Sequence, residues 1–340
     1  MKEICNMDIK SDLDQIIELI NRKRVLFVAT KNSDYLRLVQ EVGLLKKYSE
    51  SVDVIWSSDK SYVKRVIKVF SQLICTSVEK YEVIFVGFMA QMIVPVFARK
   101  WRKQLIITDF FISIYDTLVD DRKWISKTSV LAKIIKSIDK KTINKSSYII
   151  TDTKEHAKYF SVEFEMNLEK AFVLYLEADK KIYFPRQIEK PAYLKDKFIV
   201  LYFGSILPVQ GVDIVLKGAE LLENEEDIQF FIIGPIGKKI IKPELDNVTY
   251  IEWLSQEELA KIIACSDLCL AGHFSAVVGK AKRTIPGKAY IYDAMQKKII
   301  LGDTPANREL YVESDRYIYT PVGDANRLAE LISKERNNVK

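Results

Sequence analysis

Short apolar runs alternate with segments of helix length along the chain. In the first half, apolar and β-branched runs lie at residues 24–29, 52–56, 82–86, 104–108, 147–151 and 172–176. Segments of helix length lie among them, at about residues 35–48, 61–78, 88–101, 124–145 and 154–160. Strands and helices in this order predict a parallel sheet that is covered by helices on both faces.

The alternation is interrupted once, between Pro185 and Asp196, where prolines and mixed charge predict a linker. Strand-like runs then return at residues 198–203, 228–233, 248–251, 267–271 and 299–301, with helices expected at about 211–223, 255–265 and 287–296. At 340 residues, the chain is longer than one core usually serves. We therefore predict an α/β chain of two doubly wound, Rossmann-like domains, residues 1–187 and 188–340, that face each other across a cleft.

Composition favours a globular cytoplasmic protein, with 48% hydrophobic and 29% charged residues. The stretch from Met1 to Ile20 is acidic and amphipathic, unlike a signal peptide, and no uninterrupted apolar run is long enough to span a bilayer. The four cysteines are scattered, and none forms a CxxC pair. The spacing of Cys265, Cys269 and His273 allows a metal site, but Cys269 lies in an apolar strand, so we expect reduced, buried thiols and no metal.

Positive charge is concentrated in the first half. Residues 1–190 hold 33 Lys and Arg against 25 Asp and Glu, whereas residues 191–340 hold 19 against 21. Two basic segments stand out, the apolar stretch 88–98 that runs into Arg99–Lys103, and the stretch from Lys127 to Lys145. Both are typical of a helix that lies on anionic lipid, although 88–103 also fits a core helix with a basic end. Nucleic acid is disfavoured, because no binding module is recognisable.

A loop rich in Gly, Pro and cations lies near the end of the chain. It reads Arg283-Thr284-Ile285-Pro286-Gly287-Lys288, and after a helix and a short strand comes Gly302-Asp303-Thr304-Pro305-Ala306. Such a helix start offers free backbone N–H groups, the positive end of the helix dipole and mobile ammonium groups to a diphosphate. An ordinary loop of an α/β domain remains the alternative.

Glycines follow two further strands. Gly204 comes directly after the strand 198–203, Gly211 opens the next helix, and Gly234 follows the strand 228–233. Together with the closing stretch, residues 198–335 resemble the carboxyl-terminal domain of family 4 glycosyltransferases, which are retaining GT-B enzymes that use nucleotide-sugar donors. The resemblance is strongest to a subgroup with IPxK followed by GDTPAxREL, matched here from Ile285 to Leu310.

The resemblance implies a GT-B fold and a donor site for a nucleotide-diphosphate sugar, without a further cofactor. It assigns the donor to Gly204, Ser205, Gln210, Gly234, Arg283, Pro286, Gly287, Lys288, Asp293, Asp303 and Thr304. Two cations that the family uses to hold the diphosphate are replaced here by Ser205 and Gln210. Lys288, with Lys282 and Arg283, supplies the missing charge in our interpretation.

The paired glutamates of the family are also replaced. Counting back from Lys297, their positions hold Arg283 and Ile291, and Asp293 lies one helical step away as a candidate for the ribose. The first-domain histidine of the family is missing after the fourth strand, where Asp109 is the nearest polar residue. We therefore take Asp109, His273 and Lys288 as candidate catalytic residues.

The other histidine, His156, follows Thr151-Asp152-Thr153 at the start of a helix and is interpreted as a structural or capping residue.

Two functions follow from the resemblance. The first is a hexosyltransferase-like enzyme that adds a sugar, with retention, to a cell-surface polysaccharide or lipid-linked glycan precursor at the inner face of the membrane. The second is a non-catalytic GT-B subunit that stabilises or positions a partner glycosyltransferase, because the expected Arg, Lys and glutamates are absent. A sugar-nucleotide epimerase is disfavoured, since the chain lacks the His and carboxylate set for that chemistry.

Overall fold

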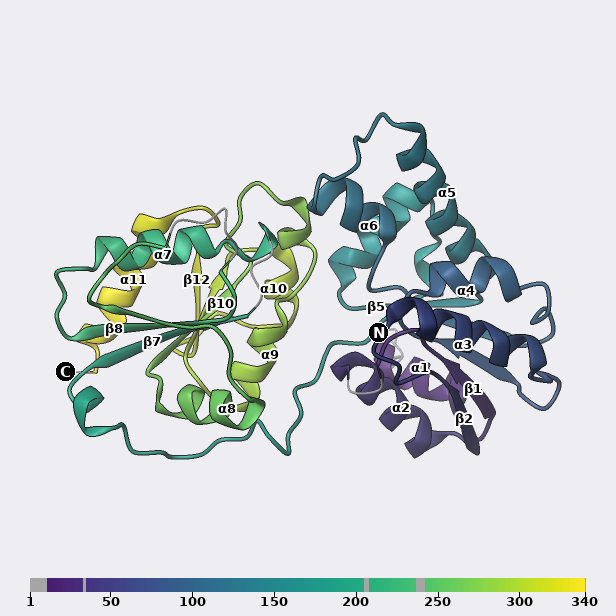
Figure 1. Ribbon diagram of the computed structural model, residues 1–340, viewed down its shortest axis with the longest axis horizontal. Coiled ribbons are helices and arrows are strands. Elements are labelled where there is room, and N and C mark those ends of the chain that lie inside the picture. The colour runs from purple at the N-terminus through teal and green to yellow at the C-terminus, as the bar shows by residue number, and fades with distance from the viewer. Residues whose placement is uncertain (1–10, 33–34, 205–207, 237–241, 340) are drawn as a thin grey trace, which may run out of the picture. The chain divides into compact units, whose positions relative to one another are not determined.

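The computed structural model describes residues 11–32, 35–204, 208–236 and 242–339. The chain divides into two compact units (Figure 1). The first unit comprises Met1–Thr117 and Ile125–Tyr175, and the second comprises Leu118–Trp124 and Leu176–Lys340. Each unit is built around its own parallel sheet of six strands.

The sheet of the first unit has the strand order β2-β1-β3-β4-β5-β6, and all of its pairings are parallel. Its strands are β1 (Arg24–Val28), β2 (Ser51–Ile55), β3 (Val83–Val86), β4 (Leu105–Asp109), β5 (Tyr148–Thr151) and β6 (Ala171–Val173). Its helices are α1 (Asp12–Ile20), α2 (Leu36–Tyr48), α3 (Tyr62–Cys75), α4 (Ala90–Phe97), α5 (Val130–Lys145) and α6 (Lys154–Phe164). Short helical turns lie at Asp116–Asp121 and Leu168–Lys170.

The central strands of this sheet are buried on both faces, which explains their unbroken apolar sequence. In β1, Leu26 and Val28 belong to one core cluster, while Val25 and Phe27 belong to the cluster on the opposite face. Alternate side chains of a strand point to opposite faces, so a sheet that helices cover on both sides needs apolar residues at every position.

The sheet of the second unit has the order β12-β11-β10-β7-β8-β9, again with parallel pairings. Its strands are β7 (Phe198–Phe203), β8 (Ile228–Ile233), β9 (Val248–Ile251), β10 (Leu268–Gly272), β11 (Ile299–Gly302) and β12 (Tyr317–Thr320). Its helices are α7 (Val212–Leu221), α8 (Gln256–Cys265), α9 (Gly287–Ala294), α10 (Pro305–Leu310) and α11 (Ala325–Asn337). Short turns of 3-10 helix lie at Ala192–Leu194, Pro208–Gln210 and Gly279–Lys282.

The two sheets confirm the predicted α/β class of two doubly wound units. The strand β12 and the helix α11 were not among the predicted elements, although α11 contributes Leu328, Leu331 and Ile332 to the core of its unit. Cys269 is buried as expected, whereas Cys265, for which burial was also expected, is only partly buried.

The apolar segment 88–103 is a core helix with a basic end. Ile93, Val94 and Phe97 of α4 are buried, and Trp101 is fully buried beside them. These apolar side chains are therefore not available to lipid, which favours the core-helix alternative for this segment. In the part of the chain that the structure describes, no helix combines the length and the apolar character needed to cross a bilayer.

Candidate functional site

The strand order of the second unit reverses between β7 and β10, and glycines stand at the carboxyl ends of both strands. Gly204 follows β7 with φ 133°, and Gly272 ends β10 with φ 88°. Ligands of open α/β sheets bind at the carboxyl ends of the strands, where the order reverses. The two glycines therefore mark the expected ligand-binding edge of this unit.

Close backbone packing explains why these positions hold glycine. A Cβ atom on Gly234, which has φ 129°, would lie 2.2 Å from the carbonyl oxygen of Gly204. A Cβ atom on Gly272 would lie 2.7 Å from Oε1 of Gln210. A Cβ atom is thus excluded at Gly234 and Gly272, which lets the turn of Gly204 and the side chain of Gln210 approach these glycines closely.

Lys288 projects into the same edge from the first turn of α9. Its Nζ donates a hydrogen bond to Oε1 of Gln210 at 2.6 Å and lies 4.0 Å from the ring centroid of Tyr202. A Cβ atom on Gly204 would lie 3.2 Å from its Cε. Lys288, Gln210, Gly204 and Gly272, which are far apart in sequence, are therefore neighbours at the point where the strand order reverses.

The ammonium group of Lys288 is buried with only neutral partners in the described structure. The residue is 5% exposed, and burial lowers the pKa of Lys288 to about 7. Among residues 11–32, 35–204, 208–236 and 242–339, no carboxylate forms an ion pair with its Nζ. Such an amine takes up a proton readily when an anion binds beside it, because the anion stabilises the ammonium form that burial has removed from water.

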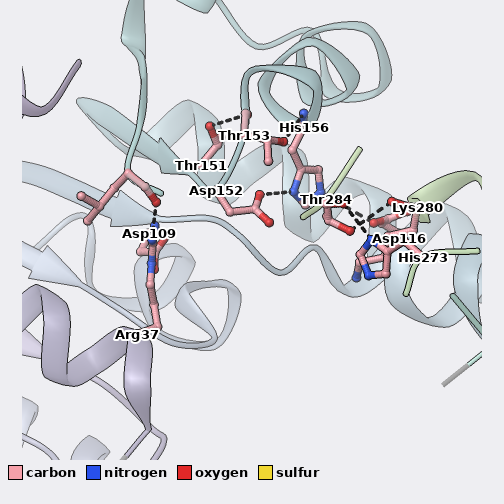
Figure 2. A network of polar contacts seen from close by, with 11 residues as sticks. Arg37, Asp109, Asp116, Thr151, Asp152, Thr153, His156, His273, Lys280 and Thr284 are labelled. Carbon is pink, nitrogen blue, oxygen red and sulfur yellow. Dashed lines mark hydrogen bonds and ion pairs between the residues drawn. The ribbon is translucent and has the colours of Figure 1, made fainter. Parts of the chain in front are cut away.

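His273 lies directly after β10, and its side chain contacts the loop that precedes α9. Its backbone is left-handed, with φ 59°, and its side chain is buried. Nδ1 lies 2.8 Å from the carbonyl oxygen of Thr284 (Figure 2). Since a carbonyl only accepts, Nδ1 carries the proton. The predicted placement of His273 at the carboxyl end of its strand is correct, and its catalytic role stays a prediction.

The remaining residues of the closing stretch have structural partners. Pro286 caps α9, and Gly287 is its exposed first residue. Thr304 is the buried N-cap of α10, and its hydroxyl accepts from the backbone N–H of Asn307.

Asp303 and Asp293 are both engaged by cations of the same unit. Asp303 pairs with Nε of Arg308 at 2.6 Å. Asp293 accepts hydrogen bonds from Arg316 at 2.7 Å and from the hydroxyl of Tyr317. These contacts favour a structural role for Asp293 over the ribose contact.

Two further donor candidates complete the predicted set. Arg283 is half-buried, and its guanidinium Nη1 would lie 3.3 Å from a Cβ atom on Gly279. Ser205 lies outside the described residues.

Asp109, at the carboxyl end of β4 in the first unit, is held in a buried ion pair. Arg37 donates from Nε at 2.8 Å and from Nη2 at 3.1 Å, one bond to each carboxylate oxygen (Figure 2). The carboxylate of Glu41, which is fully buried, lies 3.6 Å from the same guanidinium. Burial and the Asp109 carboxylate raise the pKa of Glu41 well above its ordinary value. Sequence reasoning missed Arg37 and Glu41, because 72 residues separate Arg37 from Asp109.

An aromatic cluster lies where the strand order of the first unit reverses, between β1 and β3. Phe88 follows β3, and its ring centroid lies 5.7 Å from that of Tyr35 and 6.3 Å from that of Phe111. Nζ of Lys31 lies 5.5 Å from the Tyr35 ring centroid and 5.3 Å from that of Phe88. All four side chains are half-buried, so they are partly open to a ligand. Sequence analysis did not identify this cluster.

His156 is structural, in agreement with the sequence interpretation. It lies in the first turn of α6, where its backbone N–H bonds to the capping hydroxyl of Thr153. Its Nδ1 lies 2.6 Å from Asp152, and its Nε2 lies 3.7 Å from Asp116 (Figure 2). Burial alone would lower the pKa of His156, but the two carboxylates raise it above the ordinary value.

The described residues contain no group of three or more His, Cys, Asp and Glu side chains suited to hold a metal ion. The Cys265, Cys269 and His273 spacing therefore does not form such a group.

Comparison with known proteins finds a family model that matches much of the second unit. The model is described as "Glycosyl transferases group 1" and matches residues 197–336. The second unit is therefore similar to group 1 glycosyltransferases over this range. The match includes Gly204, Gln210, Gly234 and the closing stretch with Lys288, so the candidate site lies within the matched region. No curated protein matches the chain by sequence.

Solved structures match nearly the whole chain. HepE of Anabaena, solved with UDP, has a TM-score of 0.66 at 13% identity, over 93% of this chain and 91% of that one. The same protein with UDP-glucose gives a TM-score of 0.65 at 14% identity, over 93% and 90% of the two chains. A sucrose-phosphate synthase of Thermosynechococcus elongatus gives 0.64 at 11% identity, also over 93% and 90%. At these identities the likeness establishes the fold, which is GT-B as predicted.

Proposed function

We propose that the chain is a retaining, hexosyltransferase-like glycosyltransferase with a nucleotide-diphosphate sugar as donor. The observation that carries the proposal is the buried ammonium group of Lys288, which lies beside Gln210 at the ligand-binding edge of the second unit. A buried cation without an anionic partner is costly unless a ligand supplies the anion. A diphosphate meets this need.

The donor domain in this proposal comprises residues 188–340. The diphosphate lies against the glycine turns, with Lys288 and the amino-terminal backbone N–H groups of α9 as its partners, and Arg283 adds a second cation. His273, Asp303 and Thr304 line the site. Because the complexes of HepE contain UDP and UDP-glucose, UDP-sugars are the first donors to test.

Transfer forms a bond between the acceptor oxygen and the anomeric carbon and breaks the bond from that carbon to the diphosphate. Negative charge therefore develops on the leaving oxygen of the diphosphate, and the acceptor hydroxyl passes its proton to that departing diphosphate. Lys288 stabilises the departing charge, since a preorganised cation in a site of low polarity acts strongly on a transition state. The cations and the helix end perform this step without a metal ion.

The acceptor domain comprises residues 1–187. Its aromatic cluster of Tyr35, Phe88 and Phe111 offers flat apolar faces beside the cation of Lys31. Such a platform suits a sugar ring that carries an acidic or phosphorylated group. We propose a cell-surface polysaccharide or lipid-linked glycan precursor as acceptor, at the cytoplasmic face of the membrane. Asp109, whose carboxylate is held by Arg37, fixes the structure at the carboxyl end of β4 and does not take the acceptor proton.

Binding of nucleotides tests the proposal most directly. A panel of nucleoside diphosphates and their sugars is titrated by calorimetry into wild type, Lys288→Met and the control Lys217→Met, which removes an exposed lysine of α7. We expect saturable binding of one nucleotide series, weakened by about 1.5–3 kcal/mol in Lys288→Met and unchanged in the control.

The non-catalytic alternative makes the opposite prediction. A well-folded wild-type protein that binds no nucleotide sugar would favour a GT-B subunit that positions a partner glycosyltransferase. Binding of a donor that Lys288→Met leaves intact would remove Lys288 from the site, while donor binding itself would still support a glycosyltransferase.

A further inference from the structure

The start of α5 exposes large apolar side chains. Val130, Leu131 and Ile134 are 73%, 52% and 52% exposed, respectively. The opposite face of the helix, which includes Ala132 and Ile135, is buried. Water-exposed apolar groups of this size in adjacent helical turns are unfavourable unless another surface covers them.

Exposed cations surround this apolar surface. Lys133, Lys141 and Lys145 of α5 are all exposed, and Val130, Ile134, Lys141 and Lys145 share one helix face because they are four, seven and four residues apart. The one carboxylate of the α5 sequence, Asp139, is buried. The outward face of α5 is therefore apolar in its first turns and cationic in its last turns.

Two other lysines of α5 are neutralised within the unit. Lys136 pairs with Glu163 at 2.5 Å, and Lys140 pairs with Glu165 at 2.6 Å, both at the carboxyl-terminal end of α6. These two carboxylates thus lie on the side of Lys136 and Lys140. Among the described residues, Lys133, Lys141 and Lys145 form no ion pair, so the outward cations of α5 keep their charge unpaired.

The chain before α5 adds a further cation to this surface. Lys127 is exposed and lies three residues before Val130 in the same unit.

We propose that the outward face of α5, together with Lys127, is the surface by which the protein docks on an anionic membrane. The apolar side chains enter the headgroup and acyl boundary, and the cations contact lipid phosphates. A protein partner would have to bring a complementary acidic rim around an apolar centre, whereas an anionic bilayer presents both by its nature. The inference goes beyond sugar transfer, and its test has no activity readout, so its failure leaves the proposed transferase function untouched.

The chain offers a matched control in the other basic segment. Arg99, Arg102 and Lys103 are exposed, but Phe97 and Trp101 beside them are buried. In this segment, which the structure describes in full, Val96 is the one exposed large apolar side chain, whereas α5 exposes Val130, Leu131 and Ile134. Substituting three cations in each segment therefore makes the same change of charge on two different surfaces.

The test is co-sedimentation of the full chain with phosphatidylcholine vesicles, with and without phosphatidylglycerol, at low salt. We expect binding only when phosphatidylglycerol is present. Replacing Lys133, Lys141 and Lys145 with Gln should lower the affinity by roughly 100-fold, and the matched Arg99, Arg102 and Lys103 variant should stay within about fivefold of wild type. Equal losses in both variants, or equal binding to vesicles without phosphatidylglycerol, would overturn the proposal.

A second variant tests the apolar component. Val130→Ser with Ile134→Ser changes exposed positions, so the fold is retained, which circular dichroism checks. Its vesicle affinity should fall at every salt concentration, whereas the loss in the lysine variant should shrink as salt screens the charges. If the double serine variant binds vesicles like wild type and instead dissociates a dimer in sedimentation velocity, the surface belongs to a second copy of the chain and not to lipid.

Discussion

Nζ of Lys288 lies 2.6 Å from Oε1 of Gln210, although 78 residues separate the two in sequence. Gln210 stands where the family resemblance expects a diphosphate-binding lysine. An ammonium group is thus present beside this position after all, supplied by α9 instead of the turn before α7. Lys288 is thus placed to supply the charge of the lysine that the family has at the Gln210 position. A point charge can serve this purpose from another element, because only the position of the ammonium group matters.

Donor binding should take up a proton near pH 8. Burial lowers the pKa of free Lys288 to about 7, so about nine in ten of the molecules carry a neutral amine at pH 8. A bound diphosphate raises this pKa, and affinity should therefore fall by up to tenfold per pH unit above 7. Calorimetry with a nucleotide sugar in buffers of different ionisation enthalpy should show uptake of close to one proton. The same titration of Lys288→Met should show none, and uptake that persists in this variant would contradict the assignment.

The glycine turn of the donor site should not tolerate a side chain. Gly234→Ala places a Cβ atom 2.2 Å from the carbonyl oxygen of Gly204, at φ 129°. We expect a loss of roughly 1–3 kcal/mol in unfolding free energy, because strained backbone and a steric clash combine. Gly43→Ala is the control, since nothing lies within 4 Å of the added atom in the middle of α2. It should stabilise the protein by roughly 0.5–1 kcal/mol in urea unfolding.

The buried ion pair of the first unit should matter far more for stability than a surface pair. Asp109→Asn leaves the guanidinium of Arg37 buried with one fewer counterion, and we expect a loss of about 3 kcal/mol. Asp53→Asn removes the partner of the exposed Lys80, at 2.8 Å, and should cost less than about 1 kcal/mol. Urea unfolding of both variants checks the difference. Similar small losses for both would show that Glu41 replaces Asp109 as counterion.

His156 should make stability depend on pH. Its folded pKa is raised above the unfolded value of about 6.5, so its contribution is complete below that value and is lost as pH rises through the folded pKa. Burial also raises the pKa of Asp139 to about 6, so its contribution to stability is likewise lost as the pH rises. The difference between wild type and His156→Asn isolates the histidine, and it should be larger at pH 6 than at pH 9. A difference that does not change with pH would exclude the charged form.

The sequence by itself determined the order of strands and helices. Apolar runs of strand length, helical segments and the proline-rich stretch near Pro185 depend on neighbours within a few residues, and all are legible without the fold. The closing stretch with Lys288 was legible for the same reason, because its Gly, Pro and cations are contiguous. The GT-B fold followed from the resemblance that these residues carry.

Tertiary structure decided which of these residues meet. It brought Lys288 to Gln210 and Arg37 to Asp109 across 78 and 72 residues. It also showed that Trp101 is buried while Trp124 is exposed, although both stand among cations in the sequence. Local pattern cannot settle such questions, because burial and ion pairing depend on which distant segment packs against a side chain. The sequence therefore pointed to the chemistry, and the fold selected the side chains that are placed to perform it.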